Sequence, residues 1–325
     1  MLVIVAPGQG AQVPGFLSPW LELPGMAAKF AAWSEVVGLD LVRYGTTADA
    51  EEIRDTAVAQ PLLVSAGLAA AEAMLGALCA PEPALPAGRA HVDAVAGHSV
   101  GEFTAAAIAG VLSPKEALSL VAERGRGMAD AAALTQTGMT AVLGGDGEKV
   151  LAAIAAAGLT PANNNGAGQI VAAGTTEQLA SFAENPPERA RLRPLSVAGA
   201  FHTEHMAPAT ERVRRAAQGL RPSDPDVRLL SNADGAVVES GPEYLERLIS
   251  QISSPVRWDA CTRTMADLGV TALIELTPAG TLTGLAKRAL RGIELLAVKT
   301  PDDLERAGAL IKEHAGLPAS SQQEG

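Results

Sequence analysis

Residues 92–109 read VDAVAGHSVGEFTAAAIA, and this stretch decides the fold. The apolar run Val92–Ala96 predicts a buried strand, and the alanine-rich stretch Gly101–Ala109 predicts a helix. Between them lies the pattern G-x-S-x-G, which forms a nucleophile elbow when a strand precedes it and a helix follows. Ser99 is therefore the candidate nucleophile. The alternative is an ordinary glycine-flanked turn with a solvated serine.

The composition favours a folded protein with a sizeable core and argues against a protein that binds nucleic acid. The 325 residues are 48% hydrophobic and 19% charged, which can supply a sizeable core. Aromatic residues make up only 3%, so surfaces for base stacking are not expected. The formal net charge of −11 opposes non-specific binding to nucleic acid or anionic lipid.

Targeting and redox signals indicate a cytoplasmic protein. The first residues lack a basic segment and carry too short an apolar run for a signal peptide. No stretch is expected to reach the ~18 uncharged apolar residues of a membrane span. Cys79 and Cys261 have no metal or redox spacing, so both are expected to be reduced, buried thiols.

Strands and helices alternate along most of the chain, which predicts an α/β fold with a parallel sheet. Residues 138–199 differ, because their pattern reads β-α-β-β-α-β, the ferredoxin-like order. We therefore expect a discontinuous large domain over 1–137 and 200–315, a ferredoxin-like insert over 138–199 and a flexible tail over 316–325. Outside the insert, strands are predicted at Leu2–Ala6, Val92–Ala96, Val227–Ser231, Ala272–Leu276 and Glu294–Val298.

A nucleophilic serine needs a base, and histidine is the usual one. His98 adjoins Ser99 in the turn, His91 precedes the strand and His314 lies near the tail. His202 and His205 remain, and the residues alone do not choose between them. Their H-x-x-H spacing lacks the i, i+4 arrangement of H-E-x-x-H, so no metal site is expected.

Arg124 stands on the apolar side of a predicted helix from Lys115 to about Leu134. Helical spacing puts it on one face with Ala117, Leu120, Val121 and Met128. A buried charge is expensive without a partner. Arg124 therefore either forms a structural ion pair in the core or holds a substrate carboxylate through bidentate hydrogen bonds.

The segment GQGAQV at residues 8–13 follows the first predicted strand. It lacks the third glycine of a dinucleotide-binding loop, since Val13 stands there, so nucleotide binding of that type is not expected. A glycine loop at the end of a strand can nevertheless offer backbone N–H groups to an oxyanion.

Together these residues resemble the malonyl-CoA:acyl carrier protein transacylase family, from Gly8 to about Arg288. The matching motifs are GQGAQ at residues 8–12, QP at 60–61, GHSVGE at 97–102, Arg124, AFH at 200–202 and QxxxPV at 251–256. The family fold is an α/β-hydrolase-like large domain with a ferredoxin-like insert, which agrees with the pattern above.

The resemblance implies a role for each matched residue. It makes Ser99 and His202 a catalytic dyad, with a backbone carbonyl near Gln251 orienting the imidazole. It assigns the oxyanion hole to the N–H groups of Gln9 and Val100, and the malonyl carboxylate to Arg124. The residues expected to support the site are Gln60, His98, Asn163, Asn165, Phe201 and Gln251.

The implied reaction moves malonyl from malonyl-CoA to the phosphopantetheine thiol of acyl carrier protein, for fatty acid or polyketide synthesis. Phe201 beside the histidine is typical of malonyl-selective relatives. No tightly bound cofactor and no metal are expected, and a monomer is expected. The carrier is acidic, so basic docking groups are needed: candidates are Arg189, Arg191 and Arg193 near the end of the insert, and Lys287, Arg288 and Arg291 on a late helix.

Two rival functions remain at this point. A patatin-like lipid hydrolase would use Ser99 with Asp234 of the Asp-Gly pair and leave His202 incidental. A non-catalytic module that binds carrier protein or nucleotide would require the elbow, the arginine and the histidine to be coincidences.

Overall fold

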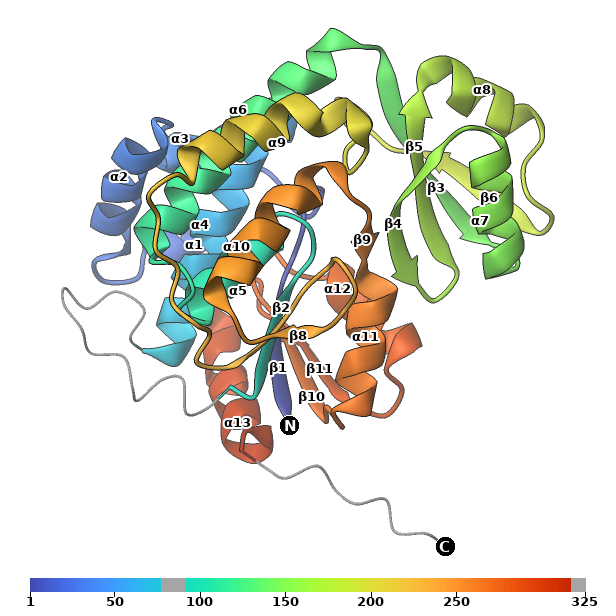
Figure 1. The fold of residues 1–325 in the computed structure, drawn as a ribbon. Coiled ribbons are helices and arrows are strands. Elements are labelled where there is room, and N and C mark those ends of the chain that lie inside the picture. Colours follow the sequence, from blue (N-terminus) through green and yellow to red (C-terminus); the bar gives the residue numbers. More distant parts are fainter. Residues whose placement is uncertain (77–91, 317–325) are drawn as a thin grey trace, which may run out of the picture.

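The computed structural model describes residues 1–76 and 92–316, which form two sheets (Figure 1). The larger sheet has the order β11-β10-β1-β2-β7-β8, and its neighbours are parallel except for β8, which runs antiparallel to β7. Its strands are β1 (Leu2–Ala6), β2 (Ala94–Gly97), β7 (Arg228–Leu230), β8 (Val237–Val238), β10 (Ala272–Glu275) and β11 (Glu294–Ala297).

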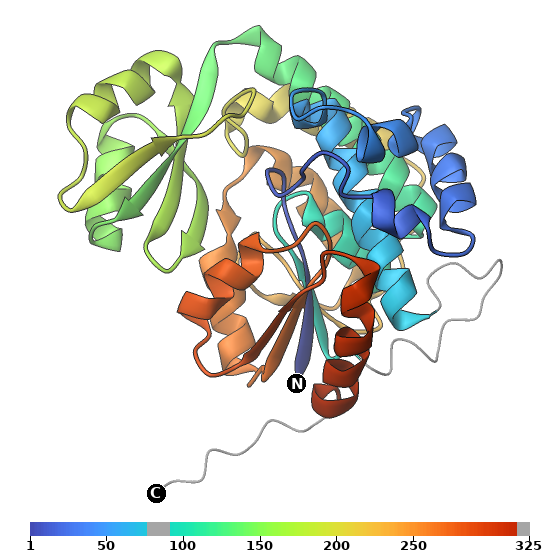
Figure 2. The same ribbon diagram turned by 180° about the vertical axis from the view of Figure 1, so that it is seen from behind.

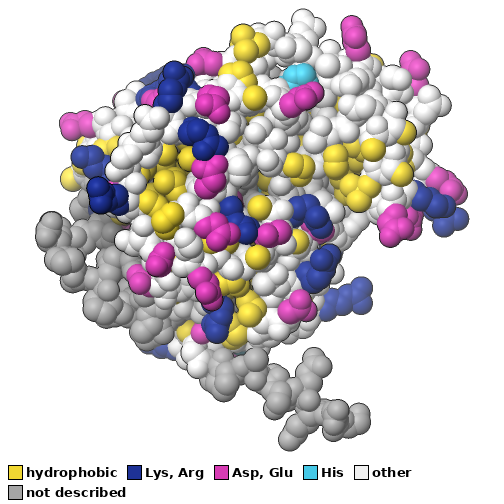
Figure 3. All heavy atoms as spheres, viewed as in Figure 1, with side chains coloured by type: hydrophobic (Ala, Val, Ile, Leu, Met, Phe, Trp, Pro, Cys, Tyr) yellow, Lys and Arg dark blue, Asp and Glu magenta, His cyan; other side chains and the backbone are white. Residues whose placement is uncertain are grey.

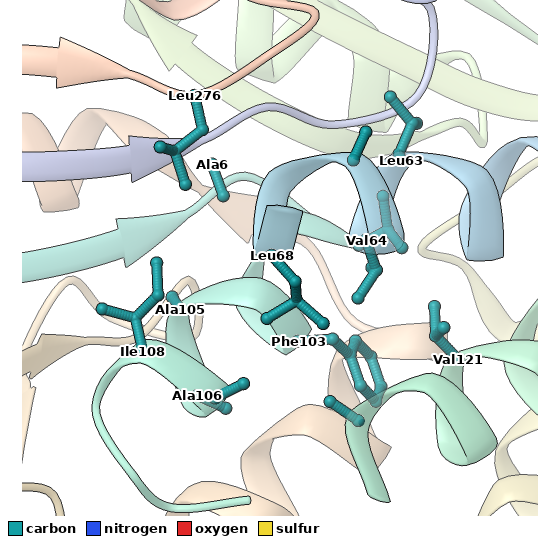
Figure 4. Packing of buried hydrophobic residues seen from close by; sticks show 14 of the residues in the cluster. Ala6, Leu63, Val64, Leu68, Phe103, Ala105, Ala106, Ile108, Val121 and Leu276 are labelled. Atoms are coloured by element: carbon teal, nitrogen blue, oxygen red, sulfur yellow. The ribbon is translucent and has the colours of Figure 1, made fainter. Parts of the chain in front are cut away.

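Helices cover both faces of this sheet, because alternate residues of a strand point to opposite sides. In β1, Leu2 and Ile4 belong to the main core, which α4, α5, α6 and α13 complete. Val3 and Val5 belong to a second core with α11 and α12. Figure 4 shows the first of these cores, and Figure 2 shows α13 beside the sheet.

The α-helices belong partly to these layers and partly to the smaller sheet described next. Their bounds are α1 (Ser18–Leu21), α2 (Met26–Val37), α3 (Leu41–Thr46), α4 (Thr56–Leu75), α5 (Gly101–Ile108), α6 (Pro114–Leu134), α7 (Gly147–Ala156), α8 (Thr176–Glu184), α9 (Ala207–Ala216), α10 (Gly241–Ser250), α11 (Trp258–Asp267), α12 (Thr281–Ala289) and α13 (Leu304–His314).

The smaller sheet has the order β6-β3-β5-β4-β9. Its strands are β3 (Thr137–Gly144), β4 (Thr160–Gly166), β5 (Gln169–Thr175), β6 (Ala190–Pro194) and β9 (Val256–Arg257). Strands β3, β4, β5 and β6 pair antiparallel with one another, and α7 and α8 cover one face with a core of their own. The opposite face carries Met139, Ala141 and Val171 into the main core.

The α/β class with a parallel sheet and a ferredoxin-like second sheet is confirmed. The limits of the two domains stay predictions, and β9 joins the smaller sheet from outside residues 138–199 by pairing parallel to β4. The strand predicted at Val92–Ala96 begins at Ala94 and includes Gly97. The segment after His202 forms a short 3₁₀ turn at Glu204–Met206, and α9 follows it directly.

Helix α4 corrects one expectation. By length and composition it could cross a membrane, although no such stretch was expected. Its apolar window is 78% buried inside the protein, where it packs against α5 and α6. Its hydrophobicity is thus explained by its position in the core.

Cys261 is a free, buried thiol, as expected. Cys79, His91 and residues 317–325 of the predicted tail lie outside the described residues.

Candidate active site

Ser99 lies on the sharp turn between β2 and α5, at the carboxyl end of the parallel sheet. Its φ of +53° is left-handed, which is strained for a residue with a side chain. The flanking glycines allow the strand and helix to approach. A Cβ at Gly97 would lie 2.0 Å from the Gly101 carbonyl carbon, and one at Gly101 would lie 2.3 Å from the Ala6 oxygen. The turn is therefore a nucleophile elbow.

His202, not His205, faces the nucleophile. Its Nε2 lies 2.7 Å from Ser99 Oγ, and its Nδ1 lies 2.8 Å from the backbone oxygen of Gln251. Since a carbonyl only accepts, Nδ1 carries the proton and donates it to Gln251, which leaves the Nε2 lone pair for the serine hydroxyl. Burial, reinforced by the charge of Arg124, lowers the pKa of His202 to about 3. The imidazole is thus a neutral base at physiological pH.

Arg124 is fully buried on α6, as its helical face predicts. Its Nη1 donates to Gln60 Oε1 at 2.7 Å, and its Nη2 donates to Gln251 Oε1 at 2.8 Å and to Ser99 Oγ at 3.2 Å. All three partners are neutral, and within residues 1–76 and 92–316 this arginine makes no ion pair. Its Nε has no hydrogen-bond partner there. A cation is thus held beside the nucleophile with only neutral side chains as its hydrogen-bond partners.

Burial lowers the pKa of Arg124 to about 9, an effect that the charge of Glu102 opposes. The guanidinium therefore remains charged at neutral pH. A buried cation that no carboxylate contacts directly attracts an anionic group of the substrate strongly, because the low local dielectric screens it little.

A cavity of about 100 Å³ opens at Ser99 between the two sheets. Met139 and Asn163 of the smaller sheet and Phe201 line it together with the dyad and Arg124. Asn165 Oδ1 accepts a hydrogen bond from Nε2 of His98 at 2.8 Å, and burial lowers the pKa of His98. The full lining is Gln9, Gln60, His98, Ser99, Val100, Arg124, Met128, Met139, Asn163, Leu195, Val197, Phe201 and His202.

The backbone N–H groups of Gln9 and Val100 both belong to residues that line this cavity. In the part of the chain that the structure describes, neither N–H donates a hydrogen bond. The N–H of Ser99 itself is occupied, because it donates to Asn232 Oδ1 at 2.8 Å. The pair at residues 9 and 100 is thus available for an oxyanion.

Two buried polar residues next to the dyad were not singled out from the sequence. Glu102 follows the elbow in the first turn of α5, and its carboxylate accepts from Asn232 N at 2.6 Å and from Gln251 Nε2. Burial raises the pKa of Glu102 to about 7. Glu102 is the last residue of the GHSVGE motif, so the sequence could have indicated that it lies near the elbow. Nothing in the sequence pattern marks Asn232.

Other candidates lie elsewhere. Asp234 pairs with Arg247 at 2.8 Å and does not line the cavity, so the Ser–Asp hydrolase arrangement is absent from the described residues. The basic groups do not come together. Arg189 precedes the edge strand β6 and Arg191 lies within it, whereas Lys287 and Arg288 lie on α12, which contacts β4 near the opposite edge.

Comparisons with known proteins agree with this geometry. Residues 3–323 match the model of the acyl transferase domain family. The malonyl CoA-acyl carrier protein transacylase of Mycobacterium tuberculosis (strain H37Rv) is 52% identical over 95% of this chain and 100% of its own length. The protein of that name from Bacillus subtilis is 33% identical over 96% of this chain and 98% of its own length.

Solved structures give the same result. The crystal structure of MCAT from Mycobacterium tuberculosis superposes with a TM-score of 0.88 at 52% identity, covering 95% of this chain and 99% of its own. A malonyl-transacylase in complex with a type II PKS acyl-carrier protein superposes with a TM-score of 0.84 at 29% identity, with the same coverage. The chain belongs to the acyl transferase family and, within it, to the malonyl CoA-acyl carrier protein transacylases.

Proposed function

We propose that this enzyme transfers a malonyl group from malonyl-CoA to the phosphopantetheine thiol of acyl carrier protein through an ester on Ser99. The observation that carries the proposal is the unpaired, fully buried Arg124, whose Nη2 lies 3.2 Å from the nucleophile Oγ. A malonyl group attached to Oγ has its free carboxylate a short distance away, where a guanidinium can bind it by two hydrogen bonds.

The first half-reaction forms the acyl-enzyme. His202 Nε2 takes the proton of Ser99 Oγ as the oxygen attacks the thioester carbonyl carbon. The N–H groups of Gln9 and Val100 stabilise the resulting oxyanion. The carbon–sulfur bond then breaks, and the imidazolium returns its proton to the departing CoA thiolate. Gln251 O stabilises the imidazolium through Nδ1, at 2.8 Å.

The second half-reaction repeats these steps with the carrier thiol as the attacking group. His202 takes the thiol proton, the thiolate attacks the malonyl ester, and the proton returns to Ser99 Oγ as the ester bond breaks. No cofactor takes part, and CoA enters only as the thioester substrate. We propose further that the enzyme is cytoplasmic and works as a monomer in fatty acid or polyketide synthesis.

The covalent step is tested by intact-mass measurement after mixing with malonyl-CoA, methylmalonyl-CoA or acetyl-CoA. We expect a malonyl adduct on the wild-type protein and none on Ser99→Ala. Label on the Ser99→Ala protein would overturn the proposed nucleophile. Wild-type protein that forms no malonyl adduct would overturn the proposed function.

Replacing Arg124 tests the carboxylate site. A hydrogen-bonded charge contributes ~1.5–3 kcal/mol, so Arg124→Ala should reduce malonyl transfer about ten- to hundredfold more than acetyl transfer. Arg126→Ala is the matched control, because Arg126 lies on the same helix but pairs with Glu123 at the surface. We expect this control to leave both rates unchanged. Equal losses of malonyl and acetyl transfer in Arg124→Ala would exclude the carboxylate role.

A further inference from the structure

Asn232 lies where the carboxyl ends of β2 and β7 meet. These strands are parallel neighbours, with Val95 beside Leu229, so the residues just after β7 lie next to the elbow that follows β2. Asn232 is fully buried and does not line the substrate cavity. No step of the proposed reaction uses it.

The Asn232 side chain bridges the two sides of the elbow. Its Oδ1 accepts from the N–H of Ser99 at 2.8 Å, and its Nδ2 donates to the carbonyl of Gly97 at 2.7 Å. These contacts fix the direction of the amide. A flipped amide would place its oxygen against the Gly97 oxygen and its NH₂ against the Ser99 N–H, so both contacts would become repulsive.

The elbow needs such a partner for two physical reasons. A left-handed φ at a residue with a side chain is unfavourable and persists only where surrounding contacts hold it. Moreover, a buried N–H or carbonyl without a partner is costly. Asn232 satisfies one of each, at Ser99 and Gly97, with a single side chain. It also occupies the Ser99 N–H, which leaves the N–H of Val100 as the elbow's donor toward the cavity.

The backbone of Asn232 is connected to His202 indirectly, through Glu102 and Gln251. Its N–H donates to Glu102 Oε1 at 2.6 Å, and its carbonyl accepts from Arg257 N at 2.8 Å. The other oxygen of Glu102 accepts from the side chain of Gln251, whose backbone carbonyl orients His202. One buried network therefore connects the position of the nucleophile with that of its base.

We propose that Asn232 is a positioning residue that holds the Ser99 elbow in its left-handed conformation and places Oγ in line with His202. It acts through the backbone of Ser99 and Gly97 and contacts no reacting atom. This role deepens the proposed malonyl transfer, on which it rests. It does not involve the substrate carboxylate, so it affects acyl groups with and without a charge alike.

Asn232→Ala removes both elbow contacts. Misplacing a reacting group by about 1 Å can reduce the rate about a hundredfold, and we expect a loss of this order in the labelling of Ser99. The same factor is expected for malonyl-CoA, for acetyl-CoA and for a fluorophosphonate that reacts with serine nucleophiles. A loss restricted to malonyl-CoA would overturn the proposal, since Asn232 would then act through Gln251 and Arg124.

In Asn232→Asp, the pH dependence of Ser99 labelling gives a readout that a merely structural role would leave unchanged. Its second oxygen faces the Gly97 carbonyl and repels it when ionised, but donates a hydrogen bond when protonated. The groups that face this site are Glu102 from α5 and Cys261 from α11, whose Sγ lies 3.6 Å from Asn232 Nδ2. Relative to wild type at each pH, labelling of the variant should recover as the pH falls from 8 to 6.

Glu275→Gln is the matched control, because Glu275 is equally buried and holds backbone N–H groups at Gly280 and Leu282. It should lower stability without changing labelling. A folded Asn232→Ala protein that labels like wild type overturns the proposal. If Asn232→Ala does not fold, the Asn232→Asp variant decides. A pH profile of its labelling that runs parallel to that of wild type would also overturn the proposal. If wild type reacts with the fluorophosphonate but not with malonyl-CoA, the proposed malonyl transfer is overturned. The role of Asn232 is then still decided by comparing fluorophosphonate labelling of wild type and the Asn232 variants.

Discussion

His202 and Arg124 are buried within one hydrogen bond of the same oxygen, yet only the arginine is charged. Burial disfavours both cations, and the charge of Arg124 further disfavours protonation of the imidazole. The base therefore stays neutral mainly because it is buried, and the charge of Arg124 adds to this effect. An anionic acyl group on Ser99 offsets that charge, so substrate binding and base strength are coupled at this site.

The low pKa of His202 predicts an unusual pH profile. An ordinary histidine has a pKa near 6.5 and loses its function as a base below that value. Since the pKa of His202 is lowered to about 3, its lone pair remains available as the pH falls. We expect the rate of Ser99 acylation by saturating acetyl-CoA, which carries no carboxylate, to stay level from pH 8 to about pH 5. A rate that halves near pH 6.5 would contradict this assignment.

Single residues differ in how far the sequence could place them. Helical spacing alone predicts that Arg124 points inward, because position on a helix is a local property. His202 could not be separated from His205 by local pattern, since the choice depends on a turn in which His202 has a φ of +61°. Asn232 follows a predicted strand, but its contact with Ser99 depends on β7 lying beside β2, and strand order is not a local property.

At the scale of elements, the crossing of β2 and α5 determines where the nucleophile lies. Gly101→Ala would place a Cβ 2.3 Å from the Ala6 oxygen, so backbone must shift. We expect a loss of about 3 kcal/mol in the free energy of unfolding, measured with urea, together with loss of Ser99 labelling.

Gly284→Ala provides the comparison, because Gly284 lies within α12 with open space around the position of a Cβ. Alanine favours the helix more than glycine does. This variant should therefore keep or raise the free energy of unfolding, by up to about 1 kcal/mol, and its urea midpoint should not fall below that of wild type. A Gly101→Ala protein with the wild-type midpoint would show that the elbow is less tightly packed than described.

Long elements were predicted well and short ones were missed. The strand and helix around the elbow have clear apolar patterns, as does the order of strands and helices in the smaller sheet. Strands β8 and β9 have two residues each, too few for a recognisable period, and they form only because longer strands offer free edges.

At the scale of the whole molecule, a net charge of −11 opposes an acidic carrier, so docking needs a local basic surface. Figure 3 shows Lys and Arg side chains mixed with Asp and Glu over the face drawn. Lys287 and Arg288 on α12 are exposed, and neither makes an ion pair within the described residues, whereas Arg189 lies 3.7 Å from Glu188. The α12 pair is the stronger candidate.

Reversing both charges, Lys287→Glu with Arg288→Glu, should raise the KM for carrier protein about three- to tenfold at low salt, with little effect at high salt. The matched control is Arg306→Glu with Lys312→Glu on α13, which covers the opposite face of the larger sheet. Steady-state transfer to carrier protein measures both. An equal rise in KM for the two pairs would indicate an effect of net charge and exclude docking at α12.

The two-residue strand β9 has a practical consequence for making chimaeras of such enzymes. It completes the smaller sheet, yet it directly follows the turn whose Gln251 carbonyl orients His202. A graft of residues 138–199 alone would leave the edge of β4 facing a strand from another parent. A chimaera that exchanges the insert should therefore take residues 251–257 from the same parent, so that β4 and β9 stay matched.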